Sequence, residues 1–127
     1  MKKTLAIAGV GLLVLAALAL GFWKGSASAR PKFDTFYQAV LLDNGQVYYG
    51  KLEGLGTPFP VLTDVYYVEH QVNSQTKEVK NVLVRRATEW HAPDRMVISA
   101  SHIVLVEPVN PTSKVADLIS QLKAEGH

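Results

Sequence analysis

The chain has 127 residues, a net charge of +2 and no cysteine. This length leaves room for one domain of roughly 80–100 residues beside an N-terminal segment. The lack of cysteine excludes disulfides, thiolate metal sites, a cysteine nucleophile and lipoprotein acylation. Residues 1–24 hold three of the 13 Lys/Arg and none of the 11 Asp/Glu, so the remainder is slightly acidic. That balance excludes a domain that binds nucleic acid through its overall charge.

Residues 1–24 predict a transmembrane anchor. A basic start precedes an uncharged run of 19 residues, Leu5–Trp23, which as a helix would span about 28 Å, close to the hydrocarbon thickness of a bilayer. The side chains expected in lipid or at its interface are Leu5, Leu12, Leu13, Leu20, Phe22, Trp23 and Lys24. A cleaved signal peptide is the alternative, because Ala27-Ser28-Ala29 fits a cleavage site, although the run exceeds the usual length of about 7–15 residues.

The orientation of this anchor decides on which side the domain lies. Basic residues on the two sides of the apolar run are nearly balanced in number. A short N-terminal tail ahead of a signal-like helix usually stays inside. We therefore expect a single-pass membrane protein, with residues 25–35 as a linker and the following domain on the periplasmic or extracellular face.

Residues 36–108 predict a small all-β barrel of five or six strands. Asp43-Asn44-Gly45 is the strongest turn signal, because Asn and Gly both tolerate positive φ between two β-prone runs. Gly50, in the second strand, permits a bulge or a sharp bend with which the sheet begins to close. In the third strand, alternation puts Val65 and Tyr67 on one face and Tyr66 on the other, with Asp64 and Val68. The expected strands are 36–42, 46–53, 61–70, 81–87, 96–99 and 102–106.

Residues 109–127 predict a short amphipathic helix. Thr112 or Ser113 can cap it, and Gly126 ends it. Its apolar stripe consists of Val115, Leu118, Ile119 and Leu122. So short a helix is marginal alone in water, so the stripe either covers one mouth or edge of the barrel or contacts a partner subunit or the membrane surface.

The hairpin resembles the first motif of the Sm-like (LSm) family of SH3-like small β-barrels. Leu42-x-x-Gly45 and Gly50-x-Leu52 match that family's spacing, and the segment Ile98–Val106 resembles its closing motif. This resemblance implies a strongly bent five-stranded barrel whose edge strands can pair between subunits into a ring. RNA binding is not implied, because Gly54–Pro60 and Ser99-Ala100 stand where the RNA-binding members carry Asp…Asn and Arg-Gly. The hairpin and the Trp/His-Pro-Met segment also resemble small single-anchor bacterial envelope proteins.

No motif in the chain predicts catalysis or a bound cofactor. His70, His91 and His102 lack the spacing of metal ligands, and any metal site would have to combine His91 and His102 with Glu89 or Asp94. Ser99 and Ser101 flank His102, but neighbours in a strand point to opposite faces. We predict neither an enzyme nor a metal or cofactor site.

Tyrosine doublets and a small cluster of basic residues could indicate nucleic-acid binding. Arg85-Arg86 and Lys80 could contact a backbone while tyrosines stack on bases. Nearby glutamates cancel this charge, and tyrosine doublets on adjacent strands form stabilising cross-strand pairs. Nucleic-acid binding is therefore not expected of this domain.

These observations favour a non-enzymatic, membrane-anchored interaction protein. It would be an accessory subunit of a larger membrane complex or a self-assembling ring. Trp90 and Phe59, in loops that contain proline, are each either a lid packed on the barrel or a contact for a partner. The contact candidates are Phe59, Trp90, His91, Tyr49, Tyr66, Leu118 and Leu122. The alternatives are an envelope protein that binds a ligand or metal and an Sm-like nucleic-acid binder that faces the cytoplasm.

Overall fold

The computed structural model describes residues 31–126, and Lys32 begins a compact unit that runs to the end of the chain. The predicted anchor and most of the predicted linker lie outside these residues. Within residues 31–126, no helix has the length and apolar character needed to cross a bilayer.

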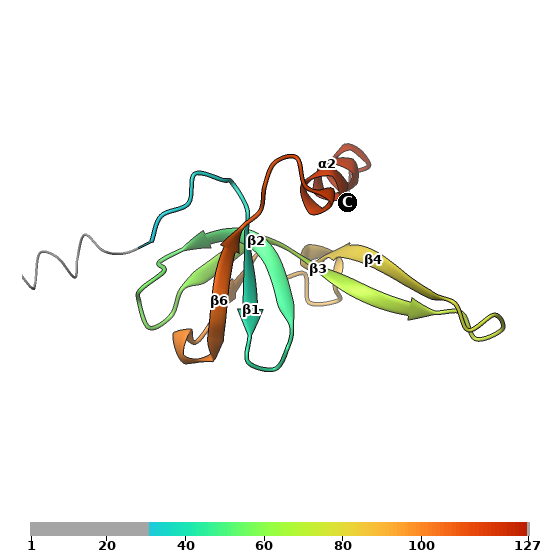
Figure 1. The fold of residues 1–127 in the computed structure, drawn as a ribbon, viewed down its shortest axis with the longest axis horizontal. Helices are drawn as coiled ribbons and strands as arrows, with labels where there is room; N and C mark the ends of the chain where they lie inside the picture. The colour runs from blue at the N-terminus through green and yellow to red at the C-terminus, as the bar shows by residue number, and fades with distance from the viewer. Residues whose placement is uncertain (1–30, 127) are drawn as a thin grey trace, which may run out of the picture. The chain divides into compact units, whose positions relative to one another are not determined.

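Six strands and one α-helix make up the domain (Figure 1). The strands are β1 (Gln38–Leu42), β2 (Val47–Glu53), β3 (Val61–Val72), β4 (Val79–Arg85), β5 (Arg95–Val97) and β6 (Ile103–Pro108). Two 3-10 helices, η1 (Arg86–Thr88) and η2 (Ala100–His102), flank β5, and α2 (Lys114–Ala124) follows β6. Every predicted strand is present, with ends shifted by one or two residues, whereas the sequence did not predict the two 3-10 helices.

The strands form one antiparallel sheet in the order β4-β3-β2-β1-β6, and β5 pairs with the start of β3. The prediction of a small, mostly β domain with a C-terminal helix is confirmed. The predicted closure into a barrel is not found, because in the described part of the chain the hydrogen-bonded path is open, with β4 at one end and β6 at the other. Unpaired edges of this kind are where other strands can add.

The turn between β1 and β2 uses one left-handed residue. Gly45 has φ +84°, while Asn44 keeps a negative φ and its side chain accepts a hydrogen bond from the Gln46 amide at 2.9 Å. The Gly45 amide bonds the Leu42 carbonyl at 3.0 Å. This is a tight turn followed by a left-handed glycine, a common three-residue hairpin loop. The Asn-Gly signal therefore located the hairpin correctly. Only the glycine, however, adopts a positive φ.

A β-bulge lies where β2 and β3 bend together. The register shifts by one residue between Tyr49 and Lys51, and Asp64 in the facing strand has φ +50°. A Cβ added at Gly50 would lie 2.7 Å from both Leu62 Cγ and the Thr63 carbonyl oxygen. The predicted irregularity at Gly50 is thus confirmed: its missing side chain permits the close approach, and the extra residue is carried by β3.

The bulge distributes the apolar side chains of β3 over both faces of the sheet. Leu62 and Val65, three positions apart, both belong to the inner core with Val40 and Ile98. Tyr66 points the other way. It packs under α2 in an outer cluster with Leu83 and Ile119, to which Tyr37, Tyr49, Val68, Val115, Leu118 and Leu122 also contribute.

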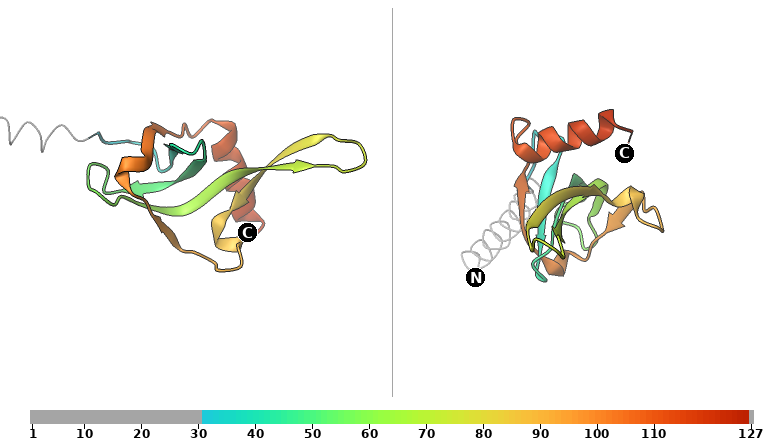
Figure 2. Two further views of the ribbon diagram at one scale, coloured as in Figure 1. Left: turned by 90° about the horizontal axis from the view of Figure 1, so that it is seen from below. Right: turned by 90° about the vertical axis from the view of Figure 1, so that its right-hand side faces the viewer.

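The end of β3 and the start of β4 form a hairpin that projects from the body of the domain (Figures 1 and 2). We call residues 69–81 the arm, and all of them are exposed. Val72 and Val79 face each other across it. The arm lies at the opposite end of the domain from the segment that leads into β1 (cyan) and from the loop 54–60 (green) (Figure 2).

We predict that Gly50→Ala lowers the free energy of unfolding by about 2–3 kcal/mol, because the added methyl group overpacks the β2–β3 contact. Gly45→Ala is the matched control: a Cβ there meets nothing within 4 Å, so only the left-handed backbone is penalised, by about 1 kcal/mol. Chemical unfolding of the full chain in detergent, followed by circular dichroism, measures both. Equal losses would contradict the steric role of Gly50.

Candidate functional site

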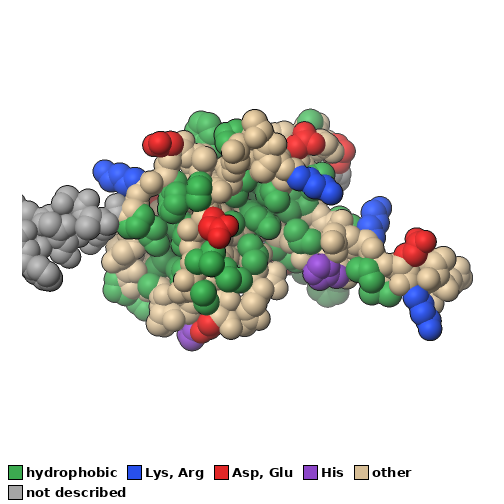
Figure 3. All heavy atoms as spheres, in the orientation of Figure 1, with side chains coloured by type: hydrophobic (Ala, Val, Ile, Leu, Met, Phe, Trp, Pro, Cys, Tyr) green, Lys and Arg blue, Asp and Glu red, His purple; other side chains and the backbone are tan. Residues whose placement is uncertain are grey.

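An apolar hollow of about 490 Å³ lies on the outer face of the sheet, beside the start of α2. We call it the outer groove. Its floor comes from β1, β2 and β6, and its wall from the segment that leads into the helix. Figure 3 faces this surface and shows hydrophobic side chains gathered over these strands next to α2. The lining residues are Ala39, Leu41, Val47, Tyr49, Leu105, Glu107, Pro108, Val109, Asn110, Ser113 and Val115.

Strand register explains why the floor is apolar. Leu41 pairs with Val47 on one side and with Leu105 on the other, so three aliphatic side chains form one row on the same face. Directly opposed residues of antiparallel strands project to the same side of a sheet. The row ends at β6, whose outer edge has no partner strand among the described residues. The groove is therefore open at the edge of the sheet.

The wall of the groove is held by local hydrogen bonds. The Val109 amide bonds the Tyr37 carbonyl at 2.9 Å. Asn110 accepts a hydrogen bond from the Thr112 amide at 2.9 Å, which tightens the turn before the helix. Ser113, one of the two caps that the sequence allowed, caps α2 by accepting a hydrogen bond from the Ala116 amide at 3.2 Å. These bonds position Val115, the helix residue that closes the groove.

A polar cluster fixes the other end of α2 to the sheet. Asp64 accepts a hydrogen bond from the Tyr37 hydroxyl and forms an ion pair with Lys123 at 2.8 Å. Arg85 binds the second carboxylate oxygen at 3.2 Å. Lys123 also donates to the Tyr37 hydroxyl at 2.6 Å. We call these four residues the Asp64 cluster; they join the start of the domain, the bulge, β4 and the last turn of α2.

Burial and pairing act in opposite directions on the carboxylate of Asp64. Burial alone would raise its pKa, but the hydrogen bonds from Lys123 and Tyr37, with the charges of Lys123 and Arg85, hold that pKa below its ordinary value. The hydrogen bonds that Lys123 donates to Asp64 and to the Tyr37 hydroxyl raise the pKa of Lys123. The cluster is therefore a carboxylate with cationic partners at neutral pH, and it fastens α2 rather than offering a group for acid–base chemistry.

Tyr66 lies next to this cluster and is fully buried. Burial, the first cause, raises the pKa of its hydroxyl to about 12. That hydroxyl has no hydrogen-bond partner among the described residues. Its ring meets the ring of Tyr37 edge-on at 6.3 Å, and the Arg85 guanidinium lies 6.0 Å from its centre. Tyr66, predicted as a contact residue, is thus placed in the packing beneath α2.

The other predicted contact residues lie in four different places. Tyr49 lines the outer groove. Leu118 and Leu122 pack in the outer cluster under α2, which therefore covers a face of the sheet, one of the two roles expected for it. Phe59 is 64% exposed and Trp90 fully exposed, at 105%, so Trp90 is not the packed lid that was one of its two interpretations. His91, 3.9 Å from Glu89, is exposed in the same loop as Trp90.

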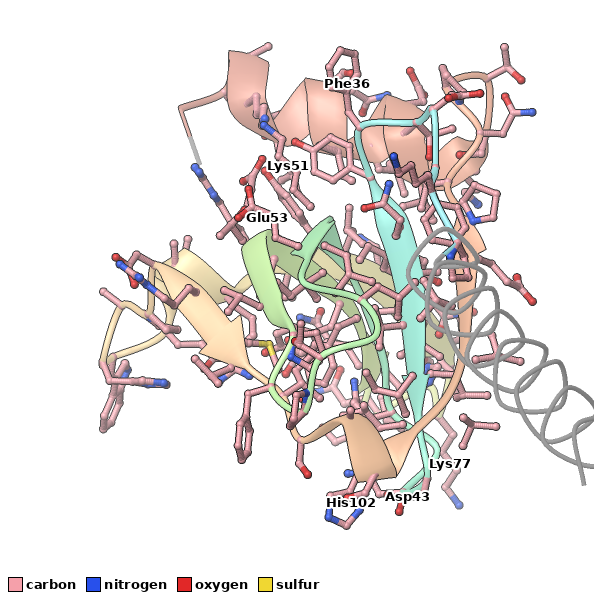
Figure 4. The ribbon with its side chains drawn as sticks, turned by 90° about the vertical axis from the view of Figure 1, so that its left-hand side faces the viewer. Phe36, Asp43, Lys51, Glu53, Lys77 and His102 are labelled. Atoms are coloured by element: carbon pink, nitrogen blue, oxygen red, sulfur yellow. The ribbon has the colours of Figure 1, made fainter. Side chains whose placement is uncertain are left out.

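The remaining polar candidates pair with ordinary neighbours. His102 binds Asp43 through Nδ1 at 2.8 Å and thereby ties η2 to the β1–β2 turn (Figure 4). Ser99 and Ser101 bond each other at 3.0 Å. Among residues 31–126, no group of three His, Asp or Glu side chains is close enough to hold a metal ion.

Sequence reasoning did not predict the outer groove or its floor of Leu41, Val47 and Leu105. One signal could have indicated it. Runs such as 39–42 and 103–106 are apolar at every position rather than at alternate ones. Such runs are typical of strands that have apolar neighbours on both faces. The pairing of β1 with β6, by contrast, joins segments more than 60 residues apart and is not visible in any local pattern.

Neither the comparison with protein-family models nor that with curated proteins finds a match to this chain.

We predict that Asp64→Asn lowers the free energy of unfolding by about 2 kcal/mol at pH 7, because a partly buried charged hydrogen-bond network is lost. Asn keeps the left-handed backbone accessible. Since the folded-state pKa of Asp64 is lowered, its stabilisation is present above the unfolded value of about 4 and is lost as pH falls through the folded value. Unfolding of both proteins between pH 3 and 7 should show the difference shrinking below about pH 4.

Asp94→Asn is the control for this prediction. Asp94 also has a lowered pKa, because it hydrogen-bonds Arg95, but its side chain is 78% exposed. Exposed pairs add little to stability, so this variant should unfold like the parent at every pH. A constant difference between parent and Asp64→Asn down to pH 3 would contradict the role of the carboxylate.

Proposed function

We propose that this chain is a non-enzymatic, membrane-anchored interaction protein whose outer groove receives a segment of a protein partner. The observation that carries this proposal is the apolar row Leu41–Val47–Leu105, which lines the groove and runs out to the edge of β6 that has no partner strand among residues 31–126. An apolar hollow with a few polar groups at its rim suits a polypeptide side chain. Here the rim groups are Glu107, Asn110 and Ser113.

The partner segment adds to the sheet as a further strand along β6. An edge strand offers unpaired amide and carbonyl groups that an extended peptide can use, while alternate side chains fill pockets on one face. Val104 and Leu105 are both exposed on β6, although both are apolar. Burial of these side chains by the added strand stabilises the complex.

The predicted anchor supports the same function. A domain tethered to a membrane meets other membrane proteins at a high effective concentration, so a small contact suffices for stable association. The partner we propose is a larger membrane protein complex, in which this chain is an accessory subunit. The contact between domain and complex lies at the groove, while residues 1–24 hold the chain in the same bilayer.

We predict that Leu105→Asp weakens partner capture at least tenfold, since a carboxylate placed in the apolar groove must be desolvated on binding. Val72→Asp is the matched control, because Val72 is more exposed, 64% against 40%, and lies on the arm. Tagged full-length chains are isolated from native membranes in mild detergent, and the captured proteins are quantified by mass spectrometry. A protein lost with Leu105→Asp and kept with Val72→Asp supports the proposal.

Equal capture by both variants would contradict the groove as the binding site. A parent chain that yields no captured protein and runs as a monomer would contradict the function itself. Both substitutions lie at exposed positions, so neither is expected to change the unfolding midpoint of the domain. A variant whose midpoint falls has a folding defect, and its loss of capture would not report on binding.

Self-assembly is a second candidate function, favoured by the free edges of β4 and β6. We propose a relationship to Sm-like barrels as its basis. β5 pairs with β3, and β6, which follows β5 after η2, pairs with β1. Pairing of two consecutive strands with different parts of the sheet supports a strongly curved sheet. Pairing of β4 in one copy with β6 in the next would produce a ring or a filament. Native mass spectrometry of the detergent-solubilised chain distinguishes this candidate, since it requires multiples of the 13.9 kDa chain.

We predict that the domain lies on the periplasmic or extracellular face. A reporter fused after His127 that is active only outside the cytoplasm should be active, because the short basic N-terminus is expected to stay inside. The same fusion should remain with membranes in alkaline carbonate, as a retained anchor does. Release of the domain as a soluble form that begins at Arg30 would instead support the cleaved signal peptide.

A further inference from the structure

We propose that the end of the domain that carries Phe59 rests on the lipid surface, so that the domain has one fixed orientation on the bilayer. This inference rests on the membrane anchor of the proposed function and adds a second, independent membrane contact. The contact is made by a strip of three side chains, Phe59, Val61 and Val97, which we call the end strip.

The end strip is built by a continuous ladder between two chain segments. Val61 pairs with Val97. Beyond this pair, the Ile98 amide bonds the Pro60 carbonyl and the Ala100 amide bonds the Pro58 carbonyl, each at 2.9 Å. Phe59 and Val97 are both exposed, and each is followed by a buried residue, so we place Phe59 on the same face as Val61 and Val97. The opposite face holds the buried residues Pro60, Leu62 and Ile98.

Phe59 is displayed by a rigid loop rather than left in a loose one. The two bonds at Pro58 and Pro60 hold the backbone on both sides of it. The loop is tightened further where the Thr57 hydroxyl donates to the Gly54 carbonyl at 2.6 Å. Both residues that flank Phe59 are prolines, whose rings fix the backbone angle φ. Even so, the Phe59 ring is 64% exposed and Val97 is 62% exposed.

The length of the tether limits how far the domain can be from the bilayer. Seven residues, 25–31, separate the predicted anchor from Lys32. Even fully extended, they span no more than about 25 Å. The segment that leads into β1 (cyan) and the loop 54–60 (green) lie at the same end of the domain, whereas the arm is at the other end (Figures 1 and 2). The attached end, which carries the loop, is therefore the end nearest the lipid.

The chemistry of the end strip suits the interface of a neutral bilayer. Aromatic and aliphatic side chains partition into the boundary between headgroups and acyl chains. The nearest basic side chain on the ladder, Arg95, is paired with Asp94 at 3.2 Å, so the strip does not depend on anionic lipids for attraction. In this orientation the arm points away from the membrane.

Single-tryptophan variants of the full chain test this inference in nanodiscs of phosphatidylcholine. Trp23 and Trp90 are the two tryptophans of the chain, and replacing both by Phe gives a silent background. Phe59→Trp is added to this background as the probe, and Val72→Trp as the control. These two positions have equal exposure, 64%, at opposite ends of the domain. The tryptophan fluorescence of each variant is measured with ordinary lipid and with lipid brominated near the headgroup. Bromine quenches tryptophan only at short range.

We expect brominated lipid to reduce the emission of Phe59→Trp to less than half and to leave that of Val72→Trp unchanged. In the Phe59→Trp protein, Val97→Ser should restore part of the emission, because it weakens the contact of the strip. No quenching of Phe59→Trp, or equal quenching of both probes, would overturn the fixed orientation. A blue shift without quenching would show that a protein contact covers the strip, and this too would overturn it.

A variant that keeps only Trp23 separates the inference from the proposed function on which it rests. If Trp23 is quenched and Phe59→Trp is not, the anchor stands and the contact of the end strip is refuted. If Trp23 is not quenched either, the anchor itself is refuted, and both proposals fail together.

Discussion

The bulge at Asp64, opposite Gly50, is the constraint on which the rest of the domain depends. One extra residue in β3 moves Val65 to the same face as Leu62 and sends Tyr66 to the other. The sheet therefore has two apolar faces, and it can be stable in water only if a second layer covers the outer one. The same extra residue points a carboxylate at the place where that layer, α2, is fastened.

The Asp64 cluster is effective because it is neither fully exposed nor fully buried. An exposed pair would be screened by salt and would contribute little. A fully buried pair would lose most of its Coulombic gain to desolvation. Asp64, 14% exposed, lies between these limits, and its carboxylate is shared by a tyrosine and two cations. The helix that it holds also contributes Val115 to the wall of the outer groove, so the electrostatics of the bulge and the shape of the groove are coupled through α2.

Local patterns predicted the strands and the C-terminal helix of this fold, but not its two 3-10 helices or its surfaces. The Asn-Gly turn and a helix cap at Thr112 or Ser113 are encoded within a few residues. The space that requires a glycine at position 50 is set by Leu62 and Thr63 of the facing strand. The Asp64 cluster joins Tyr37 to Lys123, which lie 86 positions apart, and no short-range signal reports such a contact. The loss of strict alternation in β3 has the same origin, because a bulge is set by the partner strand. Trp90 could be predicted as a contact candidate from its residue type, but its full exposure depends on how the loop packs.

The two contact surfaces of the domain differ in what they can accept. The end strip consists of apolar side chains, so it offers hydrophobic contact but no side-chain hydrogen bonds to select one partner over another. The outer groove is concave and borders the free backbone edge of β6, which supplies directional hydrogen bonds as well as apolar contact. An apolar free edge is a hazard for aggregation when nothing covers it. In the proposed function another polypeptide covers Val104 and Leu105, which accounts for two exposed apolar side chains on an edge strand.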